Sequence, residues 1–399
     1  MQGRWWVCGL LLLATILNYL DRQVLSLTAE KIIDEFGVTK EGFGMVLSAF
    51  RYSYAVMQIA GGWLVDSAGV RWLYPGAVGL WSVAGMLTAA VSSIGGLAGM
   101  RFLLGIGEAF NWPCALKTTE RLLPPKDRPL ANGIFNSGTA VGAMLAPVIV
   151  TFMTLRWGWR SAFIVTGALG FFWVIAWILY TRRFDAALRG AALRMRDAPA
   201  TMGRIARLRG FWALVASAII VNGVSYFLAD WIPLYLKTER GFSFGVGNAL
   251  SMLVYAGLDA GNLLVGFFVR ARVAAGADVV RARHTALFLS CVLMSLAVFA
   301  GFAASPWVAL ACLVATAIGV AGFLVIYLTL VQELDLARVG TTAGMLGGLG
   351  NLCYGFVSPY IGRLADLNQS AWTFAIVGIL PWIALGSILL GFRKTARQP

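Results

Sequence analysis

Apolar residues run through this chain in stretches long enough to cross a lipid bilayer. A helix needs about 20 mainly apolar residues to do so, and about twelve such stretches can be counted. They cover residues 5–26, 43–65, 73–91, 95–116, 130–155, 161–180, 211–236, 246–269, 285–304, 306–331, 340–364 and 371–392. The pattern therefore predicts an all-α polytopic membrane protein with twelve transmembrane helices.

The connections between these stretches are short, with one exception that is rich in arginine, alanine and glycine. It divides the chain into an N-terminal six-helix bundle (1–182), a basic cytoplasmic linker (183–209) and a C-terminal six-helix bundle (210–399). An offset of 212 residues places Gly107 on Gly319 and Pro147 on Pro359. We therefore expect two pseudo-symmetric halves, with the substrate bound between them near the middle of the bilayer.

Composition excludes a soluble protein. Of the 399 residues, 59% are hydrophobic and 13% charged, and the mean hydropathy is +0.77. Soluble domains are about 45–50% apolar and about 25% charged. The net charge of +14 lies mostly in the loops on one side and in the linker. This bias is the positive-inside pattern, so both termini are expected in the cytoplasm, and the basic charge does not require nucleic acid.

No metal or cofactor site can be recognised from the cysteines and the histidine. The cysteines lie in apolar stretches without metal-like spacing, and the histidine begins a stretch beside basic residues. We interpret the cysteines as small buried apolar residues and expect no cofactor. These residues are Cys8, Cys114, Cys291, Cys312, Cys353 and His284.

Two charged residues stand inside the fourth apolar stretch. Arg101 and Glu108 are seven residues apart, which places them on one helix face, about 20° apart and roughly 10 Å apart along the axis. Each costs about 3 kcal/mol at the centre of a membrane helix, so this face must point to water or to partners. The face is therefore a candidate site, although a permanent structural pair is the alternative.

Further polar residues lie at similar depths in other stretches. The first half carries Asn18, Asp21, Arg22, Arg51, Tyr54 and Gln58, and the second carries Asn222, Tyr226, Tyr255, Asp259 and Asn351. The second half has no deep arginine. We therefore expect the first half to hold an anion and the second to contact neutral polar groups.

The loop between the second and third stretches resembles the signature loop of the major facilitator superfamily. It reads Gly62-Trp-Leu-Val-Asp66-Ser-Ala-Gly69-Val-Arg71, with a serine in place of the family's basic residue after the aspartate. The resemblance implies gating roles for Asp66 and Arg71. We also assign gating to Arg128 and Asp259, although Asp259 is as easily a packing residue or a substrate ligand.

Narrower matches are similar to the anion:cation symporter branch of that superfamily. They are Asn18-Tyr-Leu-Asp21-Arg22, Arg101-Phe-Leu-Leu-Gly105-Ile-Gly107-Glu108-Ala109 followed by Trp112-Pro113, and the segments 120–128, 138–147 and 351–359. Within the branch, the closest resemblance is to bacterial hexuronate transporters, and it lies in 72–79, 94–99, 116–117, 135–138 and 142–147. The resemblance implies import of an organic anion, most simply a hexuronate or related sugar acid, by proton symport. An aldonate, glucarate, an aromatic acid or a dicarboxylic acid is the alternative cargo.

The polar residues can be given roles on this basis. Arginine binds a carboxylate through two parallel hydrogen bonds, so Arg22, Arg101 and Arg51 are candidate anion ligands. Arg51 departs from the branch pattern and either adds a second anion contact or pairs with Asp21 for structure. Hydroxyls of a sugar acid would meet Tyr54, Gln58, Asn136, Thr139, Asn222 and Asn351. Asp21 with Arg22, and Glu108 with Arg101, are candidate proton-coupling pairs, H⁺ being the coupling ion.

Other classes of protein fit less well. A drug exporter would carry a glycine- and proline-rich antiporter motif, which 138–147 lacks. An enzyme would need a nucleophile–base pair, a phosphate loop or a metal cluster, and the sequence offers none. We expect a monomer in the lipid bilayer whose partner is a small organic anion.

Overall fold

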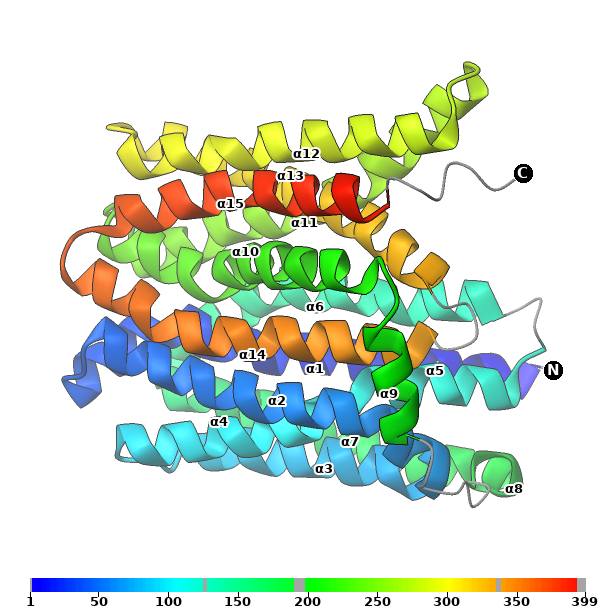
Figure 1. Cartoon of the computed structure of the whole chain (residues 1–399). Coiled ribbons are helices and arrows are strands. Elements are labelled where there is room, and N and C mark those ends of the chain that lie inside the picture. The colour runs from blue at the N-terminus through cyan, green and yellow to red at the C-terminus, as the bar shows by residue number, and fades with distance from the viewer. Residues whose placement is uncertain (1, 125–127, 190–197, 335–338, 393–399) are drawn as a thin grey trace. The chain divides into compact units, whose positions relative to one another are not determined.

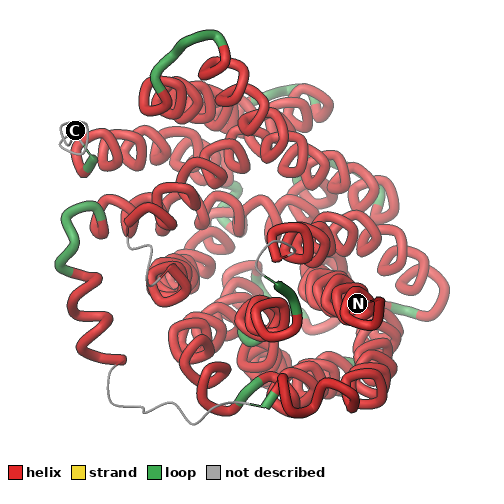
Figure 2. The backbone as a smooth tube through the Cα atoms, turned by 90° about the vertical axis from the view of Figure 1, so that its right-hand side faces the viewer, coloured by secondary structure: helices red, strands yellow, loops and turns green. Residues whose placement is uncertain are grey.

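The computed structural model describes residues 2–124, 128–189, 198–334 and 339–392, and almost all of them are helical. Figure 2 shows helices joined by short loops throughout the described chain. The expected all-α membrane fold is confirmed. Contacts divide the chain into two compact units, Met1–Ala198 and Pro199–Pro399.

Unit 1 contains seven long helices or helix pieces and a short end segment among its described residues. They are α1 (Gln2–Phe36), α2 (Lys40–Ala68), α3 (Val70–Thr88), α4 (Ile94–Glu108), α5 (Asn111–Leu122), α6 (Arg128–Trp157), α7 (Trp159–Thr181), the 3-10 turn η1 (Arg182–Phe184) and α8 (Asp185–Leu188). In this unit α1 packs on α6 and α7, α2 packs on α4, and α3 packs on α4 and α7.

Unit 2 repeats this packing with its own helices. They are α10 (Phe211–Thr238), α11 (Phe244–Ala274), α12 (Val279–Phe302), α13 (Pro306–Leu334), α14 (Val339–Asp366) and α15 (Ser370–Gly391), preceded by the short α9 (Ala198–Ala206). Here α10 packs on α14 and α15, α11 packs on α13, and α12 packs on α13 and α15. The two units therefore share one helix-packing pattern.

One pair of glycines shows the repeat at atomic detail. A Cβ on Gly107 of α4 would lie 2.9 Å from the Ala77 carbonyl oxygen and 3.0 Å from the Trp81 Cβ of α3. A Cβ on Gly319 of α13 would lie 2.6 Å from the Ser290 carbonyl oxygen and 2.9 Å from the Leu293 Cβ of α12. Trp81 and Leu293 differ by the same 212 residues as the two glycines, so the sequence offset corresponds to a structural one.

The helices expose apolar side chains along their middles, as expected of a lipid-facing surface. In α7, Phe172 is 70% exposed and Ile175 and Leu179 are each 57% exposed, whereas Trp173 and Trp177 are buried on another face. Among the described residues, eight helices are long and apolar enough to cross a membrane. The other expected stretches coincide with α2, α3, α14 and the α4–α5 pair.

The prediction of one continuous helix over 95–116 was wrong. The fourth stretch is broken at Ala109 and Phe110, so that α4 ends at Glu108 and α5 begins at Asn111. Figure 1 draws the two as separate ribbons. Pro113 accounts for the break, because it has no backbone N–H and its ring clashes with the carbonyl four residues earlier, that of Ala109.

Candidate functional site

Glu108, the last residue of α4, forms an ion pair with Arg22 of α1. The Arg22 Nε and Nη2 atoms donate hydrogen bonds of 3.0 and 2.8 Å to the Glu108 Oε2. The Glu108 side chain is fully buried and that of Arg22 is 17% exposed. A carboxylate at a helix C-terminus faces the negative end of the helix dipole, so the nearby guanidinium compensates both charges.

Aromatic rings surround the guanidinium of Arg22. Its central carbon lies 5.2 Å from the ring centroid of Tyr19, 5.2 Å from that of Phe50 and 5.0 Å from that of Tyr54. Such cation–π contacts are each worth about 0.5–1 kcal/mol at exposed sites and about 2 kcal/mol when desolvated. The rings hold the cation in place while leaving its hydrogen-bonding edge to Glu108.

Two further arginines approach the same carboxylate. Arg51 of α2 and Arg101 of α4 are each 3% exposed, and both interact electrostatically with Glu108. Close helix packing brings α2 to this position. A Cβ on Gly105 would lie 2.6 Å from the Phe50 carbonyl oxygen, so only glycine allows α4 to approach α2 this closely.

Asp21 adds a second buried carboxylate to the cluster. It is 3% exposed, with Arg101 and Glu108 as its charged neighbours and the Thr166 hydroxyl of α7 nearby. Neither carboxylate oxygen makes a hydrogen bond of good geometry to the described residues. The adjacent side chains of Asp21 and Arg22 thus serve different sides of α1, as their 100° separation on the helix requires.

These five residues form what we call the charge cluster: Asp21, Arg22, Arg51, Arg101 and Glu108. With both carboxylates ionised, three arginines against two acids give a net charge of +1, and each protonation raises it. The cluster is therefore suited to an anion. Its pairing differs from the sequence prediction, because Glu108 bonds Arg22 where Arg101 was expected, and Asp21 has Arg101 as its charged neighbour where Arg22 was expected.

The other predicted residues of unit 1 are distributed around this cluster. Tyr54 is buried against Arg22, Gln58 and Thr139 are half-buried, and Asn136 is exposed on α6. Arg71 donates hydrogen bonds of 2.7 Å to Asp185 and to Thr181, which tie α3 to the end of α7. The side chains of Asp66 and Arg128 lie outside the described residues.

Unit 2 brings amides and tyrosines together. The Asn351 Nδ2 of α14 donates to the Tyr226 hydroxyl of α10 and to the Gly347 carbonyl, both at 3.0 Å. The Tyr226 and Tyr354 rings lie 5.4 Å apart, and Asn222 lies near Gly350, one residue from Asn351. Asp259 is half-buried on α11. The described polar groups around Asn351 are neutral, in contrast to the charge cluster of unit 1.

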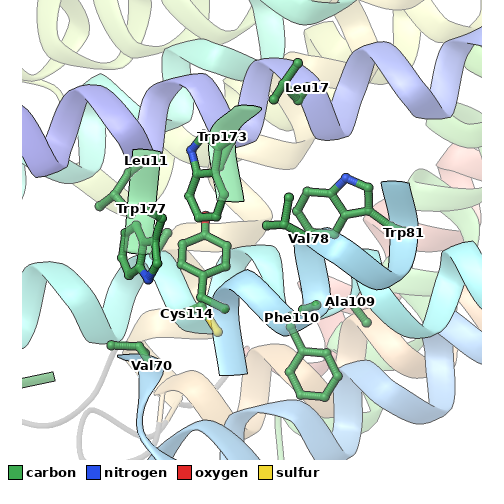
Figure 3. Close-up of a cluster of buried hydrophobic side chains, with 14 of the residues drawn as sticks. Leu11, Leu17, Val70, Val78, Trp81, Ala109, Phe110, Cys114, Trp173 and Trp177 are labelled. Atoms are coloured by element: carbon green, nitrogen blue, oxygen red, sulfur yellow. The ribbon is translucent and has the colours of Figure 1, made fainter. Parts of the chain in front are cut away.

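Sequence reasoning missed a buried network at the break between α4 and α5. The Tyr74 hydroxyl of α3 donates to the Asn111 Oδ1 at 2.7 Å, and the Asn111 Nδ2 donates to the Thr15 hydroxyl of α1 at 3.4 Å. Figure 3 shows Ala109 and Phe110 at the break, with Cys114 and the neighbouring Trp173 and Trp177 in the same core. Pro113 was the available signal, since a proline inside an apparent helix predicts a break just before it.

The fold agrees with comparisons to known proteins. A family model described as Major Facilitator Superfamily matches residues 11–339. The chain belongs to the major facilitator superfamily. It is a membrane transporter and not an enzyme.

Several bacterial transporters are similar over most of the chain. The hexuronate transporter of Escherichia coli K12 is 27% identical, over 97% of this chain and 93% of that protein. The D-galactonate transporter of Escherichia coli O6:H1 is 28% identical, over 96% of each chain. The galacturonate transporter of Dickeya chrysanthemi is 27% identical, over 79% of this chain and 96% of that protein.

Solved transporter structures share the fold. A bacterial homologue of the human lysosomal transporter Spinster, inward-facing and occupied, superposes with a TM-score of 0.79 at 20% identity, covering 99% of this chain and 98% of that one. A D-xylose–proton symporter gives a TM-score of 0.73 at 16% identity, covering 96% of each chain. At these identities the likeness concerns the fold alone.

Proposed function

We propose that this protein imports a hexuronate or a related sugar acid by proton symport. The observation that carries the proposal is the charge cluster, in which the Arg22–Glu108 pair is buried beside Arg51, Arg101 and Asp21. Relatives that are 27–28% identical bear the names of hexuronate, galacturonate and D-galactonate transporters, which supports this cargo class. The proposal includes a monomer in a bacterial inner membrane with both termini in the cytoplasm.

Arg22 is the first candidate ligand for the substrate carboxylate. Its guanidinium is fixed by three aromatic rings and already binds a carboxylate, that of Glu108, through two hydrogen bonds. A substrate carboxylate presents the same chemical group to the same fork of donors. Arg101 and Arg51 supply further positive charge to the cluster, which lowers the cost of an additional anion.

Competition for Arg22 would couple the anion to a proton. When a substrate carboxylate captures the guanidinium, Glu108 is left buried without its hydrogen-bonded partner. A desolvated carboxylate that loses its cation binds a proton more readily, so the anion and the proton enter together. Asp21, which is also buried in the cluster, is a second proton acceptor in this proposal.

Neutral polar residues would recognise the hydroxyls of the sugar acid. In unit 1 these are Tyr54, Gln58, Asn136 and Thr139, and in unit 2 they are Asn222 and Asn351. A site built to hydrogen-bond a hydroxyl rejects analogues that lack it, because its own polar groups would then be left unpaired. Gating by Asp66, Arg71, Arg128 and Asp259 completes the proposal.

Uptake into proteoliposomes under an inward proton gradient tests the cargo. D-glucuronate, D-galacturonate, D-galactonate, D-glucarate and an aromatic carboxylate should be compared at equal concentration. We expect uptake of at least one of the sugar acids and weaker uptake of the aromatic acid. Failure of all four sugar acids would refute the sugar-acid assignment and leave the fold untouched.

Glu108→Gln tests the coupling. The variant keeps the shape and hydrogen-bonding capacity of the side chain but has no charge to titrate, so we expect it to lose gradient-driven accumulation and retain counterflow exchange. Glu120→Gln is the matched control, because Glu120 lies in a half-exposed pair with Lys117 on α5. Normal concentrative uptake by Glu108→Gln would contradict the role given to Glu108.

A further inference from the structure

We propose that Asn111 is a positioning residue that sets the angle between α4 and α5 and thereby holds Glu108 against Arg22. The proposal rests on the coupling role given to Glu108 above. The described side-chain hydrogen bonds of Asn111 go to Tyr74 and Thr15, which lie outside the charge cluster. The effect of Asn111 would therefore reach Glu108 through the backbone of the break.

The backbone hydrogen bonding is irregular at the break between α4 and α5. The last bonds of α4 are those of the Ala109 N–H to the Gly105 carbonyl and of the Phe110 N–H to the Gly107 carbonyl, both 3.3 Å. The first backbone bond of α5 is that of the Cys114 N–H to the Phe110 carbonyl, at 3.0 Å. Pro113 has no N–H to donate to the Ala109 carbonyl, so the helical ladder is interrupted at the junction and side-chain contacts help to set the angle between α4 and α5.

Asn111 supplies such contacts on two sides. It is fully buried, as are Tyr74 and Thr15, and it is bonded to α3 through Tyr74 and to α1 through Thr15. An amide that accepts from one helix and donates to another fixes both its position and its orientation, because each bond has a preferred direction. The first residue of α5 is thus held between two neighbouring helices.

Two residues on one face of α1 form hydrogen bonds to the chain on either side of the break between α4 and α5. Thr15 and Arg22 are seven residues apart on α1, which is about two turns and roughly 10 Å. Thr15 bonds Asn111 after the break, and Arg22 bonds Glu108 before it. Asn111 is held against α1 by Thr15. A change in the angle between α4 and α5 would therefore move Glu108 relative to Arg22.

Several charged and titratable groups face Glu108 and would share in any change of its protonation. They come from α1, α2 and α4, and are Tyr19, Asp21, Arg22, Arg51, Tyr54 and Arg101. Arg22 is the one whose hydrogen bonds to Glu108 are described, so it is the contact most sensitive to orientation. A weaker hold by Arg22 favours the protonated carboxyl and moves its titration to higher pH.

The test uses the double variant Asn111→Leu with Tyr74→Phe in the full-length protein. Removing both partners with side chains of similar shape avoids leaving a buried polar group unpaired, so the protein should still fold. The protonated Glu108 carboxyl is titrated by infrared difference spectroscopy, and its band is identified by its loss in Glu108→Gln. Thr118→Val is the matched control, because Thr118 is buried on the same helix and bonds only the carbonyl of Cys114 in the described contacts.

We expect the midpoint of the Glu108 band to move to higher pH by about 0.5 to 1 unit in the double variant and to stay in place in Thr118→Val. D-glucuronate counterflow measured against pH should move in parallel, and this second shift should be absent in the Glu108→Gln background. An unchanged band midpoint would overturn the role of Asn111 while leaving proton symport intact. A failure of the proposed function would appear differently, as coupled uptake retained by Glu108→Gln.

Discussion

Replacing Arg22 with methionine should destabilise the protein through Glu108. Methionine fills a similar volume among Tyr19, Phe50 and Tyr54 but donates no hydrogen bond and carries no charge. The change removes the 3.0 and 2.8 Å bonds to a carboxylate whose side chain is fully buried. The loss of stability therefore depends mainly on the Glu108 carboxylate, which stays buried without its hydrogen-bonded partner.

The size of the effect can be estimated from the surroundings. Breaking a buried ion pair by removing one partner costs about 3–5 kcal/mol, because the other charge stays buried. Arg51 and Arg101 remain near Glu108, and the Arg22 side chain was 17% exposed, so we expect the lower end, about 3 kcal/mol. Adding Glu108→Gln removes the stranded charge and should recover about 2 kcal/mol of that loss.

Equilibrium unfolding in mixed micelles of increasing denaturing-detergent fraction measures these differences. The four proteins of the cycle are the wild type, Arg22→Met, Glu108→Gln and the double variant. Lys117→Met with Glu120→Gln provides a control cycle on a partly exposed pair, where coupling below about 1 kcal/mol is expected. Additive effects of Arg22→Met and Glu108→Gln would refute the ion pair as a unit of stability.

Two further changes test the packing of unit 1 and the recognition by unit 2. Gly105→Ala places a Cβ 2.6 Å from the Phe50 carbonyl oxygen, so it should lower the stability by about 1–3 kcal/mol and reduce transport. Gly99→Ala on the same helix is the control, because its Cβ would meet nothing within 4 Å and the change should be neutral or slightly stabilising. Unfolding and uptake of the two variants are compared at equal protein amounts. Asn351→Ala removes the donor to Tyr226 and should raise KM for a hexuronate by about tenfold or more, with a smaller effect on an analogue that lacks the hydroxyl concerned. Equal effects on both sugars would indicate that Asn351 serves structure alone.

The fold could be predicted because each membrane-spanning helix is visible in the sequence as one long apolar stretch. Long apolar stretches and their short connections gave the helices of both units, and the 212-residue offset gave the repeat that Gly107 and Gly319 display. The identities of the charged residues at the cluster could also be predicted, since a charge in the middle of an apolar helix is costly and therefore informative. Arg22, Arg51 and Arg101 are all buried or nearly so.

The pairing of those charges could not be read in the same way. Sharing a face put Arg101 and Glu108 on one side of α4, but seven residues separate them by roughly 10 Å along the axis, which exceeds the reach of a direct bond for many rotamers. The partner that does bond, Arg22, is 86 residues away in sequence. Its distance to Glu108 depends on where α1 and α4 lie in the folded unit, which reflects packing such as that of Gly105 of α4 against α2 and the break before Asn111.

The division of the fourth stretch has a consequence for how the protein is made. α4 has 15 residues and α5 has 12, so they measure roughly 22 and 18 Å, and neither crosses a hydrocarbon core of about 30 Å unaided. The two pieces must enter the bilayer together, carrying Arg101 and Glu108 with them. The first helix is synthesised long before, and it already holds Arg22 and Thr15, one partner for each side of the break. We therefore expect α1 to assist the insertion of this segment, since it offers a partner to each of the two pieces.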